Sequence, residues 1–135
     1  IGKAKVVKEG SDVSIVAFSI MVGKALEASD LLSNEGIEAE VIDLRTIRPL
    51  DVETIITSVK KTNRIVTVEQ GWPTCGIGAE ISSVVGEEAF DFLDAPVKRV
   101  AGVDVPMPYA ANLEKLALPQ TSDIVSAAKA VCYRG

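Results

Sequence analysis

The sequence contains no histidine, which narrows the chemistry that this chain can perform. Histidine is the residue whose unperturbed pKa suits proton transfer near neutral pH. The two cysteines, Cys75 and Cys132, form no CxxC pair, so they indicate reduced thiols of an intracellular protein rather than a redox or zinc site. We therefore expect neither a metal site nor a self-contained catalyst.

Long hydrophobic runs and basic clusters are missing as well. The apolar segments, such as residues 13–21, are too short to cross a bilayer, and no signal peptide is visible. The formal net charge is −5 and no stretch concentrates Lys and Arg, which argues against nucleic-acid binding. Aromatic residues make up only 4% of the chain against 47% hydrophobic residues. The core is therefore expected to consist of Val, Ile, Leu and Ala, as in a buried parallel sheet.

At 135 residues, the chain has the length of one domain. It shows no internal repeat, low-complexity tract or linker, so residues 1–135 are expected to form a single domain. Because the sequence begins at Ile1 rather than Met, we expect this domain to be part of a longer protein.

Apolar patterning predicts strands that alternate with helices. The expected strands are residues 5–9, 13–19, 37–44, 64–68 and 97–101. The expected helices are residues 22–35 before a C′ glycine at Gly36, 52–59 behind an N-cap at Asp51, 77–85, and a last helix that starts near 121–123. This alternation predicts a three-layer α/β/α sandwich with a mostly parallel sheet.

The segment VTVEQGWPTCGIGAEI (66–81) feeds a strand through a glycine-bearing turn into a helix, an arrangement that often binds phosphate. Ile81 occupies the position where a dinucleotide fingerprint needs its third glycine, and no GxxxxGK[ST] occurs. Glu69 and Glu80 already supply negative charge beside the helix N-terminus. We therefore expect these glycines to serve close packing of helix against strand rather than phosphate binding.

Arg45 and Arg48 lie on one loop in the segment IDLRTIRPLD. Two guanidinium groups on a loop can clamp a carboxylate or a phosphate. The alternative, which we favour, is that they form ion pairs with Asp43, with Asp51 or with a neighbouring subunit. In either case they are candidate interface residues.

The segment DVPMPY (104–109) is a second candidate interface. Its prolines, with Met107 and Tyr109, make a semi-rigid and partly apolar ridge of the kind that a partner protein covers. The alternative is a loop that caps one edge of the sheet. The residues alone do not separate the two.

Several phrases occur together in an order that is typical of one family: IDLRTIRPLD, VTVEQGW with GIGAEI, LDAPVKRVAG, and DVPMPYAANLEKLALPQ. They resemble the C-terminal domain of the pyruvate dehydrogenase (acetyl-transferring) beta-subunit family, which is transketolase C-terminal-like. The resemblance covers essentially the whole chain. It implies a five-stranded, mostly parallel sheet with one antiparallel edge strand.

The resemblance also implies how the work of the parent enzyme is divided. That enzyme decarboxylates pyruvate and reductively acetylates lipoyl groups, and so feeds acetyl-CoA synthesis in the mitochondrial matrix. The active-site groups of the beta subunit lie in a preceding pyrimidine-binding domain, and thiamine diphosphate and Mg²⁺ are held mainly by the alpha subunit. We therefore assign no catalytic, cofactor-binding or metal-binding residue to this chain, and expect it alone to be inactive and to bind no cofactor.

The implied role of the chain is assembly and docking. By resemblance, its partners are the alpha subunit and a second beta subunit in an α2β2 tetramer, and the subunit-binding domain of the dihydrolipoamide acetyltransferase. Asp94 matches the family position that meets a basic residue of this domain, and the terminal carboxylate at Gly135 is the second acceptor. The alternatives are a free-standing flavodoxin-like nucleotide-binding module, or the same domain from a branched-chain 2-oxo acid dehydrogenase or a transketolase-type enzyme.

Overall fold

The computed structural model describes residues 3–45, 50–70, 76–101 and 119–133. Strands and helices alternate along most of the chain, as the apolar patterning predicts. The elements are, in chain order, β1 (Lys5–Lys8), β2 (Val13–Ala17), α1 (Met21–Ser33), β3 (Ala39–Asp43), α2 (Val52–Thr62), β4 (Ile65–Val68), α3 (Ile77–Glu88), the 3-10 helix η2 (Phe90–Phe92), β5 (Lys98–Val100) and α5 (Thr121–Val131).

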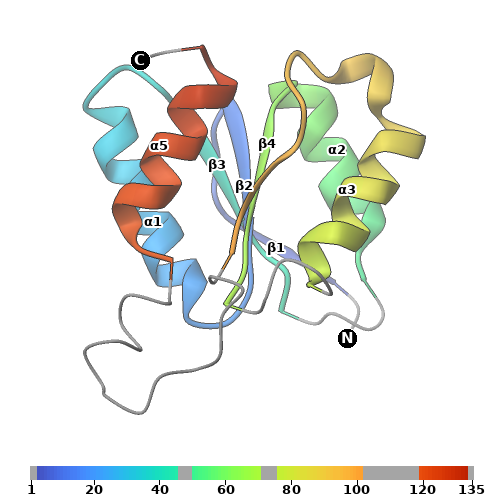
Figure 1. The fold of residues 1–135 in the computed structure, drawn as a ribbon, viewed down its shortest axis with the longest axis horizontal. Coiled ribbons are helices and arrows are strands. Elements are labelled where there is room, and N and C mark those ends of the chain that lie inside the picture. Colours follow the sequence, from blue (N-terminus) through green and yellow to red (C-terminus); the bar gives the residue numbers. More distant parts are fainter. Residues whose placement is uncertain (1–2, 46–49, 71–75, 102–118, 134–135) are drawn as a thin grey trace.

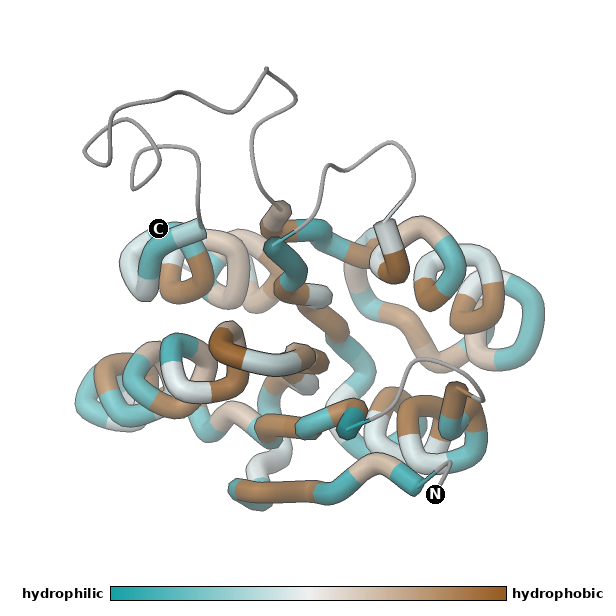
Figure 2. The backbone as a smooth tube through the Cα atoms, turned by 90° about the horizontal axis from the view of Figure 1, so that it is seen from below, coloured by the Kyte–Doolittle hydropathy of each residue, from teal (hydrophilic) through white to brown (hydrophobic). Residues whose placement is uncertain are grey.

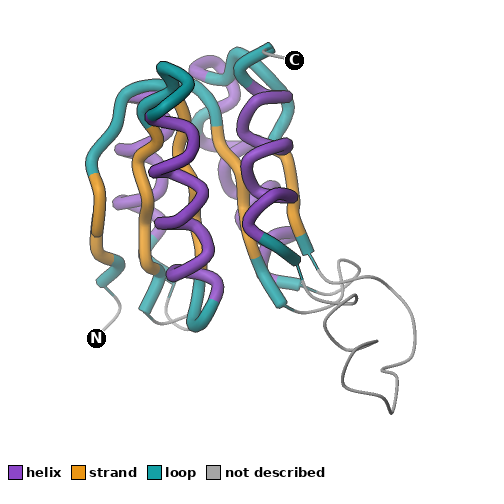
Figure 3. The backbone as a smooth tube through the Cα atoms, turned by 90° about the vertical axis from the view of Figure 1, so that its left-hand side faces the viewer, coloured by secondary structure: helices purple, strands orange, loops and turns teal. Residues whose placement is uncertain are grey.

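The strands form one five-stranded sheet in the order β1-β3-β2-β4-β5. Strands β2 to β5 pair in parallel, and β1 adds an antiparallel edge beside β3. Helices α1 and α5 cover one face of the sheet, and α2 and α3 cover the other (Figure 1, Figure 3). The predicted three-layer sandwich with one antiparallel edge strand is therefore confirmed.

Each face of the sheet carries its own apolar core. Along β2, Val13, Ile15 and Ala17 pack on the side of α1 and α5, whereas Val16 packs on the side of α2 and α3. This alternation follows from the two-residue period of a strand. Figure 2 shows hydrophobic strand segments lying between the two pairs of helices. Among the described residues, the buried apolar side chains are those of Val, Ile, Leu, Ala and Met21, as the low aromatic content predicts.

The ends of the elements follow local signals. Asp51 caps α2 as predicted, because its Oδ1 accepts the N–H of Thr54 at 3.2 Å. Gly36 adopts the left-handed conformation (φ 84°), but α1 is capped at Asn34, so Gly36 is the second residue after the cap (C″) and not the first (C′) as predicted. Strand β2 ends at Ala17 rather than at the predicted residue 19, where Ser19 has a left-handed φ of 61° that cannot continue an extended strand.

A buried polar network joins α2 to the sheet, and the apolar pattern of β2 did not predict it. The hydroxyl oxygen of Ser14 lies 2.5 Å from that of Ser58 and 2.7 Å from that of Thr62. Ser58 also donates to Glu40 at 2.8 Å. Glu40 is only 3% exposed and forms an ion pair with Lys61. Each buried polar group of this network therefore has a partner, which is the condition for burying it without a large loss of stability.

Candidate functional site

The carboxyl ends of the parallel strands meet at one end of the molecule, where ligands of open α/β sheets usually bind. Glu69 follows β4 at this end, and only 5% of the residue is exposed. Its Oε2 accepts the N–H of Gly78 in the first turn of α3 at 3.1 Å. Its Oε1 accepts a hydrogen bond from Nη2 of Arg99 in β5, also at 3.1 Å. The helix N-terminus is therefore already occupied by a carboxylate of this chain.

The glycines of the turn make room for that carboxylate. A Cβ atom added at Gly76 would lie 2.1 Å from Oε2 of Glu69, and one at Gly78 would lie 2.6 Å from Oε1. The expected close packing is thus present, but what packs against the glycines is a buried acidic side chain rather than strand backbone. A phosphate placed beside Gly76 and Gly78 would meet the charge of Glu69 at short range, so the described residues disfavour phosphate binding there.

Arg45 also lies at this end, two residues after the last residue of β3. It is exposed and has a left-handed φ of 64°. Its contact with Asp43 runs through its backbone N–H, which donates to Oδ1 at 2.9 Å. The carboxylate of Asp51 is engaged by Thr54 and by the N–H of Ala4 at 2.9 Å. Among the described residues, Arg45 therefore forms no ion pair with either acid, and the predicted alternative of a pair with a neighbouring subunit stays a prediction.

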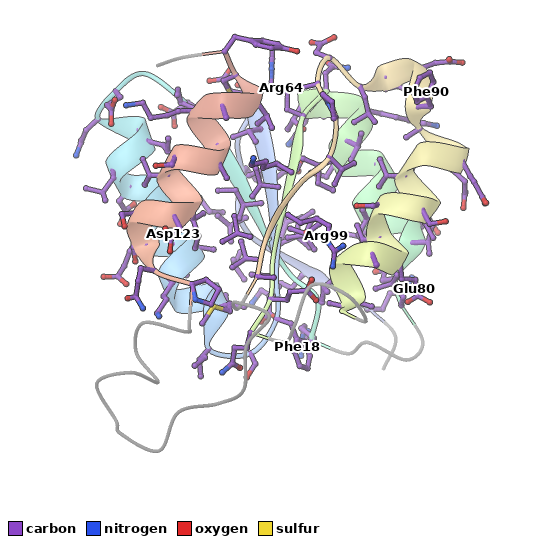
Figure 4. The ribbon with its side chains drawn as sticks, viewed as in Figure 1. Phe18, Arg64, Glu80, Phe90, Arg99 and Asp123 are labelled. Atoms are coloured by element: carbon purple, nitrogen blue, oxygen red, sulfur yellow. The ribbon has the colours of Figure 1, made fainter. Side chains whose placement is uncertain are left out.

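The opposite end of the molecule carries Asp94. Its side chain is 55% exposed, and its Oδ2 lies 3.5 Å from Nη2 of Arg64. Its backbone N–H donates to the carbonyl of Asn63 at 2.8 Å, and its carbonyl accepts the hydroxyl of Tyr133 at 2.9 Å. Tyr133, near the end of the described chain, thus contacts Asp94, whereas a docking face formed with the chain terminus stays a prediction. Figure 4 shows Arg64 at the end of the molecule away from Phe18, which follows β2.

Three exposed aromatic side chains lie near Asp94 in the sequence or contact it: Phe90 and Phe92 precede it by four and two residues, and the hydroxyl of Tyr133 donates to its carbonyl. Phe90 is 69% exposed, Phe92 is 40% exposed and Tyr133 is 71% exposed, which is unusual for aromatic residues in a chain with so few of them. We call Phe90, Asp91, Phe92, Asp94 and Tyr133 the acidic-aromatic face. Sequence reasoning identified Asp94 but missed the aromatic part, because the segment EEAFDFLD gives no sign of which apolar residues point outward.

The other predicted interface residues, Arg48, Met107, Tyr109 and Gly135, lie outside the described residues, and so does Cys75. Within the described ranges, no group of three His, Cys, Asp or Glu residues is arranged to hold a metal ion. No described helix has the length and apolar character needed to span a membrane.

Comparison with curated proteins gives close relatives. The chain is 66% identical to the pyruvate dehydrogenase E1 component subunit beta-2, mitochondrial, of Oryza sativa subsp. japonica, over 99% of this chain and 36% of that protein. It is 61% identical to the pyruvate dehydrogenase E1 component subunit beta of Rickettsia felis, over 98% of this chain and 40% of that protein. The chain thus spans well under half of the length of these relatives, and the predicted resemblance to pyruvate dehydrogenase beta subunits is confirmed.

Solved structures and a family model match the chain as well. A split-gene transketolase, described as an inactive beta4 tetramer, has a TM-score of 0.85 and 35% identity over 98% of this chain and 42% of that chain. A 2-oxoglutarate:ferredoxin oxidoreductase shares the fold, with a TM-score of 0.60 and 16% identity over 96% of this chain and 19% of that chain. Residues 2–124 match the family described as the transketolase C-terminal domain. The chain therefore belongs to the transketolase C-terminal domain family.

Proposed function

We propose that this chain is the assembly and docking domain of a pyruvate dehydrogenase beta subunit. The whole protein, with its alpha subunit, would decarboxylate pyruvate and reductively acetylate lipoyl groups. The observation that carries the proposal is the 66% identity to a beta subunit of that name over 99% of the chain. The chain by itself is proposed to be catalytically inactive.

The division of labour in this proposal is supported by Glu69. The α3 N-terminus is the place that most resembles a phosphate site, and Oε1 of Glu69 and Nη2 of Arg99 already form an ion pair there, 3.1 Å apart. Thiamine diphosphate and Mg²⁺ are therefore proposed to bind elsewhere in the whole enzyme, on the alpha subunit and on a preceding domain of the beta subunit.

The proposed partners are the alpha subunit, a second beta subunit and the subunit-binding domain of the dihydrolipoamide acetyltransferase. The acidic-aromatic face suits the last of these, because its exposed Asp94 offers a carboxylate to a basic partner. The net charge of −5 favours steered association with such a partner and makes it sensitive to salt. The relatives include mitochondrial proteins and rickettsial bacterial proteins. We propose the mitochondrial matrix as the location of this protein.

The proposal is tested on the full-length beta subunit assembled with its alpha subunit. Pyruvate should be decarboxylated at least about tenfold more efficiently than branched 2-oxo acids, since a mismatched side chain in a pocket costs on the order of tenfold or more. The reverse preference would assign the chain to the branched-chain enzymes instead.

Docking is tested in the same assembly with Asp94→Asn. Capture by the immobilised subunit-binding domain should weaken about tenfold at low salt, with pyruvate decarboxylation unchanged. The matched control is Asp30→Asn, which removes one negative charge from a side chain that is 80% exposed and pairs with Lys8. If Asp94→Asn and Asp30→Asn are captured equally well, Asp94 is not a docking residue.

A further inference from the structure

Arg64 joins three segments that are far apart in the sequence. It lies directly before β4, after the left-handed residue Asn63 (φ 64°). Its Nε donates to the carbonyl of Val131 at 3.1 Å, and its Nη1 donates to the carbonyl of Asp12 at 3.4 Å. Its Nη2 lies 3.5 Å from Oδ2 of Asp94. One guanidinium group therefore contacts the end of α5, the turn before β2 and the acidic-aromatic face.

The backbone of Arg64 is fixed as firmly as its side chain. Its carbonyl accepts the N–H of Ser14 at 2.8 Å and the hydroxyl of Thr62 at 2.9 Å. Both donors belong to the buried polar network between β2 and α2. The side chain of Arg64 is 26% exposed, whereas that of Asp94 is 55% exposed. The guanidinium is thus less exposed than the carboxylate and is hydrogen-bonded to the backbone of two other segments.

Arg64 also fixes where the C-terminal end of α5 lies relative to Asp94. The carbonyl of Val131 belongs to the last turn of this helix, where backbone carbonyls lack partners within the helix and carry partial negative charge. A cation bound to this carbonyl neutralises the helix end. Tyr133, just beyond the helix, returns to donate its hydroxyl to the carbonyl of Asp94 at 2.9 Å. The end of the described chain and the exposed carboxylate are therefore held side by side.

We infer that Arg64 is a positioning residue for docking: it holds the Asp94 carboxylate in a fixed place beside the end of α5, so that a basic partner meets an oriented carboxylate. This inference rests on the proposed docking function. Arginine suits the role because its planar group offers several donors in fixed directions, whereas lysine offers one compact centre. Loss of Arg64 should remove the positive charge beside Asp94, so a basic partner should associate slightly faster. The Asp94 carboxylate would also be poorly oriented, so the partner should dissociate much faster.

The test uses the full-length beta subunit assembled with its alpha subunit, as wild type, Arg64→Met and Arg64→Lys. Binding to the acetyltransferase subunit-binding domain is followed as association and dissociation rates. Both variants should bind about tenfold more weakly, almost entirely through faster dissociation, as is usual for changes within one interface. The control Lys8→Met removes the same charge from a cation that pairs with Asp30 on another surface, and it should bind like wild type.

A second measurement needs no partner. Hydrogen exchange is followed in peptides that cover residues 92–95 and 130–133, where the backbone N–H groups of Asp94, Cys132 and Tyr133 are hydrogen-bonded. Arg64→Met should speed their exchange about tenfold relative to peptides from β2 and β4. In the wild type, local unfolding of these segments has to break the contacts of Arg64, and without them it costs less free energy. Arg64→Lys should have an intermediate effect, and it remains informative if Arg64→Met fails to fold.

The outcomes separate this inference from the function on which it rests. Faster exchange in the variants, together with a wild type that is not captured, means that Arg64 organises this end of the chain but that the docking function is wrong. Unchanged exchange overturns the positioning role. Tighter capture of Arg64→Met overturns it too, because Arg64 would then compete with the partner for Asp94. Wild-type behaviour of Arg64→Lys in both measurements shows that charge alone suffices and overturns the role of the planar group.

Discussion

At the start of α2, the carboxylate of Asp51 connects two parts of the chain. It caps the helix through the N–H and hydroxyl of Thr54, and it accepts the N–H of Ala4 in the segment that leads into β1. The pKa of Asp51 is lowered from its ordinary value of 3.8. Burial raises this pKa, but the hydrogen bonds from Thr54 and Ala4, with the charge of Lys3, outweigh burial and favour the ionised form.

This direction predicts how the stability of the fold depends on pH. Because the folded-state pKa lies below the unfolded one, Asp51 contributes stability above the unfolded pKa and loses it as the pH falls through the folded pKa. Asp51→Ala should therefore cost about 2 kcal/mol of unfolding free energy at neutral pH, from the lost cap and the unpaired N–H of Ala4. The cost should shrink when the pH is lowered below the ordinary value of 3.8.

The measurement is urea unfolding of wild type and Asp51→Ala across this acid range. Asp30→Ala is the control, since that side chain is 80% exposed and should change stability by no more than about 0.5 kcal/mol. A difference between wild type and Asp51→Ala that stays constant down to the lowest pH would show that the ionised carboxylate is not its source.

The N-terminus of α3 is capped by a residue that does not belong to the helix. Its N-cap is Gly76, which has no side chain to accept the first N–H groups, and Glu69 from the end of β4 supplies the acceptor instead. The same carboxylate binds Arg99 of β5. One buried acid thus connects two neighbouring strands with the helix that lies over them, and the glycines leave the space that it needs.

Gly78→Ala should therefore destabilise the protein, although alanine is the better helix former. Its Cβ would lie 2.6 Å from Oε1 of Glu69, so the buried carboxylate must move away from Arg99 and the helix end. We expect a loss of about 1 to 3 kcal/mol in unfolding free energy, the scale for adding a methyl group to a site that has no room for it.

The matched control lies in the same helix. A Cβ at Gly86 meets no atom within 4 Å, so Gly86→Ala should stabilise the protein by about 0.5 to 1 kcal/mol. Combining Gly78→Ala with Glu69→Ala should cost less than the sum of the two single changes, because each removes the same contact. Additive losses in denaturant unfolding would mean that Gly78 and Glu69 act independently.

The elements also show how far the sequence alone reaches. Strand and helix positions follow from apolar periodicity, and the cap at Asp51 follows from its side chain, so these were predicted. The network of Ser14, Ser58 and Glu40 was not, because a serine in an apolar strand carries no mark of a partner 44 positions away. The exposure of Phe90 and Phe92 was missed for the same reason: burial is set by what packs against a residue, and that depends on the fold.

On the scale of the whole molecule, the two ends of the sheet differ in character. The carboxyl ends of the strands, the usual binding end of this fold, hold an acid that is buried and paired. The other end presents the acidic-aromatic face, in which the side chain of Asp94 is 55% exposed. This distribution fits a domain that binds other proteins. A charge that is buried and paired is not available to a ligand, whereas an exposed charge near aromatic side chains can contact a partner protein.

The last prediction concerns the isolated chain. Titration calorimetry with thiamine diphosphate and Mg²⁺ should give no saturable heat, because an added diphosphate would meet the charge of Glu69 at the only strand-to-glycine turn that resembles a phosphate site in the sequence. Glu69→Gln removes that charge and keeps an acceptor for the N–H of Gly78, so it tests whether repulsion alone prevents binding. The assembled full-length enzyme, titrated in the same way, is the positive control. Micromolar binding by the wild-type domain would mean that this end of the sheet is a cofactor site after all, and that the division between a docking domain and a catalytic remainder is wrong.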